Sequence, residues 1–253
     1  MKIILNADDF GYCNGVNLGI IESFKCGIVR STSMLAAMPG FDHAVRLAAQ
    51  YPGLGIGVHL TLSVGKSVGG AYATITDRDG YFLPIKEIER RAARMEIDLS
   101  EVETEFEFQI RKIQAARIVP DHFDSHHHIH RLPGIEKVFL NLAKKFGVAV
   151  RSYSKEALTG EYAGIRTTDD FDDTFYNGNI SEKHLKEIIE RYDGTSLEIM
   201  CHPAYLDQRL LENSSYSMKR IFELKELTNP AMKVFIKEKG HELCSFGEIG
   251  NRR

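Results

Sequence analysis

The feature that most constrains the fold is a regular alternation of short apolar runs with longer amphipathic runs. The runs "KIILNAD" (2–8), "STSMLAAM" (31–38) and "LGIGVHLTL" (54–62) resemble buried strands, and a helical pattern follows the first two directly. Seven or eight such strands separated by helices predict one parallel α/β domain over residues 1–253. A (β/α) barrel-like, TIM-like fold, seven-stranded or irregular, is our first choice. An open doubly wound sheet is the second, because the sequence does not show closure.

The other expected elements continue this alternation. They are strands at 120–128, 148–152, 164–171, 196–203 and 242–246, and helices at 15–27, 41–51, 100–117, 135–147, 181–192 and 218–239. Residues 66–99 are expected to form an insertion, with a hairpin around Asp79 and Gly80, because this dipeptide suits the positive φ of a tight turn. Ser100 and Glu103 are spaced as a capping box for the helix that follows.

Composition excludes several classes of function. A net charge of −3 gives no electrostatic footprint for nucleic acid or an anionic membrane. The N-terminus becomes acidic too early for a signal peptide, and no apolar run approaches the ~20 residues of a membrane span. The four cysteines are scattered without a CxxC pair, which indicates free thiols. We therefore expect a cytoplasmic protein without nucleic-acid or membrane partners.

Polar residues gather where the expected strands end. Asp8 and Asp9 end the first strand, His59 lies late in the third, and His202 ends the penultimate one. The run "DHFDSHHHIH" (121–130) adds a further acidic and histidine-rich strand end. Ligands bind outside the carboxyl ends of parallel strands, so these groups are expected to converge on one rim.

An aspartate and two histidines from different strands suit a divalent metal that keeps positions open for water and substrate. Our candidate ligands are Asp9, His59 and His126, and Asp124 is expected to orient one of the imidazoles. Asp8 points away from Asp9 in an extended backbone. A carboxylate beside metal-bound water is nevertheless placed to act as its general base.

The histidine run separates by face if it is extended. His126, His128 and His130 then share one side with Asp124, while His127 faces away as a structural residue. His128 and His130 would line a substrate cleft. The alternatives without a functional role are a solvated loop, or core histidines that form hydrogen bonds with the backbone. A lone His59 is more often a buried histidine with satisfied hydrogen bonds, and "DDFG" alone fits a turn or a helix cap.

Five motifs in order resemble the YdjC-like carbohydrate deacetylases, a group that includes chitooligosaccharide deacetylases. They are "NADDFG", "GVHLTL", "DSHHHIH", "TTDDF" and "CHPAY", and the resemblance runs from about Lys2 to Tyr205. It implies a barrel-like fold related to polysaccharide deacetylases, one divalent metal ion, described as Mg²⁺, and a homodimer. Zn²⁺ suits two imidazoles and one carboxylate at least as well.

Mapped onto this sequence, the resemblance assigns Asp9, His59 and His126 as metal ligands, Asp8 as the catalytic base and His202 as a general acid. The expected reaction is removal of an acetyl group from a small N-acetylated amino-sugar oligosaccharide by metal-bound water. Sugar contacts are expected from His128, His130, Phe10, Tyr176 and Tyr205. Two alternatives stay open: a metal-dependent phosphoesterase or sugar isomerase on a similar barrel, and a metal- or sugar-binding protein without catalysis.

Overall fold

All ladders of the sheet pair parallel strands, as the alternation of strands and helices predicts. The structure is a computed structural model and describes residues 1–151 and 158–250. Its strands are β1 (Lys2–Phe10), β2 (Ser31–Met34), β3 (Gly55–Leu60), β4 (His122–Ser125), β5 (Ala149–Val150), β6 (Asp170–Asp172), β7 (Ser196–Cys201) and β8 (Glu242–Leu243). Ser152, which the sequence places at the end of the fifth strand, lies outside the described residues.

The strand order is β5-β4-β3-β2-β1-β7-β6, and β8 pairs with the beginning of β1. Successive strands therefore lie side by side from β1 to β5, and β7 and β6 return to the other side of β1. This is the cyclic order of a barrel, left open between β5 and β6 in the described part of the chain. The barrel-like prediction is confirmed as a curled half-barrel, and the doubly wound order is not the one that forms.

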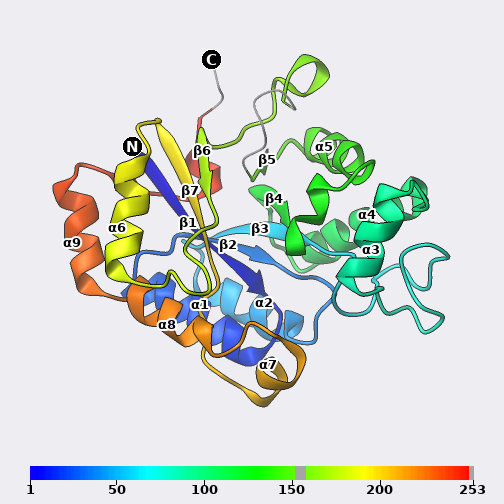
Figure 1. The fold of residues 1–253 in the computed structure, drawn as a ribbon, viewed down its shortest axis with the longest axis horizontal. Helices are drawn as coiled ribbons and strands as arrows, with labels where there is room; N and C mark the ends of the chain where they lie inside the picture. Colours follow the sequence, from blue (N-terminus) through cyan, green and yellow to red (C-terminus); the bar gives the residue numbers. More distant parts are fainter. Residues whose placement is uncertain (152–157, 251–253) are drawn as a thin grey trace.

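Helices lie on three sides of the strands in Figure 1. They are α1 (Asn14–Cys26), α2 (Phe41–Gln50), α3 (Ile85–Ala93), α4 (Leu99–Ala115), α5 (Ile135–Phe146), α6 (Glu182–Arg191), α7 (Gln208–Asn213), α8 (Lys219–Leu227) and α9 (Pro230–Glu238). Short 3₁₀ helices are η1 (His126–Arg131), η2 (Gly160–Tyr162) and η3 (Phe246–Glu248). None of the helices in the described part of the chain has the length and apolar character needed to cross a membrane.

Two local predictions about helix ends are wrong. The single helix expected at 218–239 is divided into α8 and α9, because Pro230 has no N–H to donate and instead begins α9, with Asn229 as its cap. The helix α4 is capped by Asp98, whose side chain accepts from the N–H of Ser100, so Ser100 is inside the helix rather than at its cap.

The insertion is tied to α4 by two carboxylates. The N–H groups of Val68 and Gly69 each donate to Glu105 at 2.9 Å. The N–H groups of Ala73 and Thr74 donate to Glu101 in the same way. A two-stranded hairpin does not form here: the segment makes isolated antiparallel bridges, Lys66 with Tyr81 and Thr76 with Phe82. Gly80 does adopt a positive φ of 82°, as the dipeptide predicts.

Alternation along β1 separates the outside of the half-barrel from its inside. Ile3, Leu5 and Ala7 belong to the main apolar core between sheet and helices. Ile4 instead packs in a small second cluster with Ala149 of β5, Cys244 directly after β8, and Phe246 of η3. Asn6 and Asp8 follow Ile4 at intervals of two and are buried polar residues. The interior is therefore apolar at the start of β1 and polar at its carboxyl end, where the candidate site lies.

Candidate functional site

A cavity of about 600 Å³ opens at the carboxyl ends of β1, β3, β4 and β7. Its walls carry carboxylates, imidazoles and tyrosines together. They include Asp8, Asp9, Tyr12, His59, Ser63, His126, His127, His128, Asp173, Tyr176, His202, Ser214, Ser215, Tyr216 and Arg220. The strand ends that the sequence singles out thus converge on one cavity.

The two aspartates at the end of β1 both face this cavity because the backbone turns between them. Asp9 has a φ of +73°, in the left-handed region that aspartate tolerates better than most residues. A fully extended strand would place Asp8 and Asp9 on opposite faces, as assumed from the sequence. The turn instead brings Asp8 Oδ2 to 4.0 Å and Asp9 Oδ1 to 3.5 Å from Nε2 of His59. The prediction that Asp8 points away is wrong for this reason.

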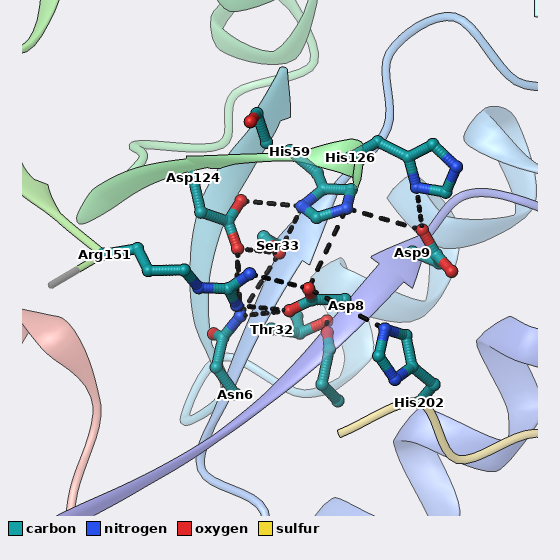
Figure 2. Close-up of polar contacts among 12 residues, drawn as sticks. Asn6, Asp8, Asp9, Thr32, Ser33, His59, Asp124, His126, Arg151 and His202 are labelled. Carbon is teal, nitrogen blue, oxygen red and sulfur yellow. Dashed lines mark hydrogen bonds and ion pairs between the residues drawn. The ribbon is translucent and has the colours of Figure 1, made fainter. Parts of the chain in front are cut away.

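His59 is held by Asp124 on the neighbouring strand. The two are register partners in the β3–β4 ladder, and His59 Nδ1 lies 2.7 Å from Asp124 Oδ1. Because a carboxylate only accepts, Nδ1 carries a hydrogen in this bond, so Nε2 is the nitrogen left for a metal ion. Asp124 is buried and also accepts from the hydroxyl of Ser33 at 2.8 Å. Figure 2 shows this arrangement.

His126 completes a three-residue group. Its Nδ1 lies 2.9 Å from Asp9 Oδ1, the same oxygen that faces His59. The donor atoms of Asp9, His59 and His126 all lie within 4.8 Å of one another, close enough to hold one metal ion. Asp8, His59 and Asp124 form a second group of this size. Arg151 already pairs with both carboxylates of that second group, so the first group is the better cation site.

The charges around His59 fit a cation. Burial alone would lower the pKa of His59, but the carboxylates of Asp124, Asp8 and Asp9 outweigh it and raise this pKa to about 9. Burial likewise acts against ionised Asp9, whose pKa is nevertheless held well below its usual range by Arg220 and His126. The negative field that draws a proton to His59 would also attract a divalent ion.

Asp8 forms a buried, two-pronged ion pair with Arg151. The two guanidinium nitrogens of Arg151 lie 2.8 and 2.6 Å from the two oxygens of Asp8. Arg151 also contacts Asp124 at 2.9 Å and Glu198 at 2.8 Å, and its side chain is inaccessible to solvent. Burial would raise the pKa of Asp8, yet Arg151 and His59 lower it, so Asp8 is a carboxylate at neutral pH.

His202 lies on the opposite side of Asp8 from Arg151, with its Nε2 4.0 Å from Asp8 Oδ2. Its backbone N–H donates to Glu223 Oε2 at 2.5 Å, and Tyr216 donates its hydroxyl to the same carboxyl group. Burial and the charge of Arg220 lower the pKa of His202 to about 4. Burial also raises the pKa of Glu223 to about 7. His202 is therefore a neutral imidazole at rest.

The extended geometry expected for the histidine run is wrong. The strand β4 ends at Ser125, and His127 and His128 take positive φ values of 57° and 52° within η1. This turn brings His127, expected to face away, to the cavity wall, where its Nδ1 lies 2.9 Å from Ser63 Oγ. His128 lines the cavity as expected.

His130 is the residue of the run that the turn removes from the site. It is fully buried, its Nδ1 lies 2.5 Å from Ser125 Oγ, and its ring stacks on Phe139 at 4.8 Å. The predicted cleft position of His130 is therefore wrong, because the chain leaves the strand direction before reaching it.

Of the three aromatic residues predicted to contact sugar, only one lines the cavity. Tyr176 lines the cavity, where its ring stacks on Tyr216 at 4.1 Å and lies 5.5 Å from His202. Phe10 is fully buried in the apolar core, and Tyr205 is half-exposed outside the cavity wall. Neither Phe10 nor Tyr205 is placed to touch a ligand in this cavity.

Four functional candidates do not emerge from the sequence alone. Arg151, Tyr216, Arg220 and Glu223 reach the site from outside the recognised motifs. Arg151 follows the two-residue strand β5 directly, and a charged residue there was an available signal for an inward-facing group. Arg220 and Glu223 lie on α8, where the sequence offers only an ordinary charged helix.

Relatives of this chain agree with the motif resemblance. The family described as YdjC-like protein matches residues 2–238. A protein of Clostridium beijerinckii named carbohydrate deacetylase is 39% identical over 98% of this chain and all of its own length. A protein of Listeria monocytogenes with the same name is 41% identical over the same shares.

Solved structures agree on the fold. A proposed cellobiose-phosphate cleavage protein of Enterococcus faecalis is 35% identical, covers 97% of both chains and superposes with a TM-score of 0.88. A peptidoglycan N-acetylglucosamine deacetylase is only 11% identical but has a TM-score of 0.52 over all of this chain and 90% of its own, which shows a shared fold. The match of the family over nearly the whole chain and the close relatives together establish that this protein belongs to the YdjC-like family.

Proposed function

We propose that the protein is a metal-dependent hydrolase that removes the acetyl group from N-acetylated carbohydrates, with small chitooligosaccharide-type amino sugars as substrates. One observation carries the proposal: the Asp9–His59–His126 group, the carboxylate of Asp8 and the imidazole of His202 line one cavity. The carbohydrate deacetylase name of the Clostridium and Listeria relatives supports the same reaction.

Asp9, His59 and His126 would hold the metal ion. A divalent ion held there would lower the pKa of water and polarise a carbonyl group. The resemblance favours Mg²⁺, whereas two imidazoles and one carboxylate suit Zn²⁺ at least as well. Asp124 would orient His59 toward the ion through the 2.7 Å bond to Nδ1.

Asp8 would accept a proton from the attacking water. Arg151 keeps this carboxylate ionised and fixes both oxygens, so Asp8 is a positioned acceptor rather than a strong base. Removing the proton while the nucleophile attacks would build charge on the acetyl oxygen.

His202 would deliver the proton to the leaving amine. It is neutral at rest, so it has to gain a proton during turnover, and Asp8 Oδ2 lies 4.0 Å from its Nε2. A proton passed from water to Asp8 and on to His202 reconciles the low pKa of this imidazole with its role as an acid. Glu223 would hold the backbone of His202 in place through the 2.5 Å bond.

Tyr176 and His128 remain our proposed sugar contacts, and the turn in η1 adds His127 to them. The stacked pair of Tyr176 and Tyr216 offers the flat apolar face that a sugar ring packs against. A homodimer and a cytoplasmic location also remain predictions.

The phosphoesterase alternative needs a second metal ion. The group of Asp8, His59 and Asp124 is the place for one, but Arg151 holds both of its carboxylates. Counting the metal ions per chain distinguishes the two hypotheses. One ion supports the deacetylase, and two ions would support the phosphoesterase.

A screen of N-acetylated mono-, di- and trisaccharides with the metal-loaded protein tests the proposal. Acetate release from at least one sugar is expected, with no cleavage of the glycosidic bond. Release of phosphate from sugar phosphates without any acetate would overturn the proposal. An Asp8 variant that keeps its metal but changes no measurable reaction would favour a binding protein.

A further inference from the structure

Arg220 is a buried cation on the wall of the cavity that the proposed steps do not use. It is the second residue of α8 and is 3% exposed. Its Nε donates to the carbonyl oxygen of Tyr216 at 2.8 Å, and its Nη2 donates to Asp9 Oδ2 at 2.6 Å. These two bonds fix the plane of the guanidinium group.

The remaining nitrogen, Nη1, is buried and has no hydrogen-bond partner among the residues that the structure describes. A guanidinium group carries only donors, so whatever satisfies Nη1 must supply an acceptor oxygen. Buried charged donors are rarely left unpaired in folded proteins, so an unpaired one on a residue that lines a cavity is a candidate contact for a group bound there.

Asp9 connects the guanidinium group of Arg220 to the candidate metal group. Its Oδ1 faces His126 and His59, and its Oδ2 faces Arg220. One carboxylate therefore has the candidate cation on one side and the guanidinium group on the other. Arg220 lines the same cavity as the candidate ligands, so a ligand bound to the cation would lie beside its guanidinium group.

We propose that Arg220 is a substrate-binding residue whose Nη1 donates to the acetyl oxygen during attack and to the acetate that is released. This rests on the proposed function, because acetate is the anion which that reaction creates in the cavity. A donor aimed at the oxygen on which charge develops stabilises the transition state more than the ground state. A carboxylate oxygen also forms a strong, charge-assisted hydrogen bond with a guanidinium N–H.

The test measures acetate binding by the metal-loaded protein in the absence of substrate, by titration followed with ¹³C NMR. Arg220→Lys keeps the charge that faces Asp9 but removes the planar donor group. We expect its dissociation constant for acetate to rise about tenfold or more, with the metal content unchanged. Arg209→Lys, an exposed arginine beside the neighbouring cavity, is the matched control and should bind acetate like the wild type.

Unchanged acetate binding in a folded Arg220→Lys variant would overturn the proposal, and so would Arg220-dependent binding of inorganic phosphate without acetate. If the variant does not fold, the test is an NMR titration of wild-type protein with ¹⁵N-labelled arginine. Acetate, but not chloride at equal ionic strength, should then shift the guanidinium signals assigned to Arg220, and no shift refutes the proposal. Acetate binding without any deacetylation would contradict the proposed function alone.

Discussion

His59 Nδ1 and Asp124 Oδ1 lie 2.7 Å apart across the β3–β4 ladder, between two residues that are register partners. The bond settles which nitrogen of His59 is free to face Asp9. Asp124 is fully buried, so neither partner can exchange this bond for one to water. The orientation of one candidate metal ligand therefore depends on a residue that does not face the ion.

Replacing Asp124 by asparagine should lower metal affinity about 10- to 100-fold, because the amide keeps the shape but not the charge that orients His59. Competition with a chromophoric chelator measures this affinity, and circular dichroism checks folding. The exposed Asp42→Asn variant is the control and should bind metal normally. Unchanged affinity in Asp124→Asn would show that this bond does not support the site.

Glu223 should make stability depend on pH. Its pKa is raised to about 7 from an ordinary value of 4.5, so the folded protein holds a proton that the unfolded chain releases. The stability from Glu223 is then fully present below about pH 4.5 and lost as the pH rises through 7. The difference in free energy of unfolding between wild type and Glu223→Gln should fall by about 1.4 kcal/mol per pH unit between about pH 5 and 7.

Urea unfolding at a series of pH values measures this difference. His202 also titrates abnormally, but its pKa of about 4 lies below the pH range in which Glu223 loses its proton. Glu89→Gln, on the exposed face of α3, should run parallel to the wild type. A wild-type curve parallel to that of Glu223→Gln would mean that Glu223 is ionised in the folded protein.

His128 and His130 should respond differently to the same substitution. Asparagine tolerates the positive φ of His128, so His128→Asn should fold normally and raise KM for the sugar about 2- to 10-fold. His130→Asn should lower the free energy of unfolding by about 2–4 kcal/mol, because it removes a buried ring stacked on Phe139. Its KM should be unchanged. The reverse pattern would restore the extended-strand interpretation of the run.

Strand-end reasoning was sufficient to gather Asp9, His59 and His126, because parallel strands carry their carboxyl ends to one edge whatever their exact length. It was also sufficient for the barrel-like fold, where helical and strand periods alternate along the chain.

The errors about the two aspartates and the histidine run came from assuming an extended backbone. A left-handed residue at Asp9 turned both aspartates to one side, and two more at His127 and His128 reordered the histidine run. A sequence pattern of period two does not indicate which residues adopt a left-handed conformation. Arg220 and Glu223 were missed for another reason: they belong to a helix far along the chain, and only the closing of the half-barrel brings α8 to the cavity.

The most direct test measures acetate and new primary amine in the same reaction on N,N′-diacetylchitobiose, for metal-loaded wild type and Asp8→Asn. The account predicts equal amounts of both products from the wild type and a rate at least about 100-fold lower in Asp8→Asn with its metal retained. Absence of both products, or identical rates in the two proteins, would contradict it.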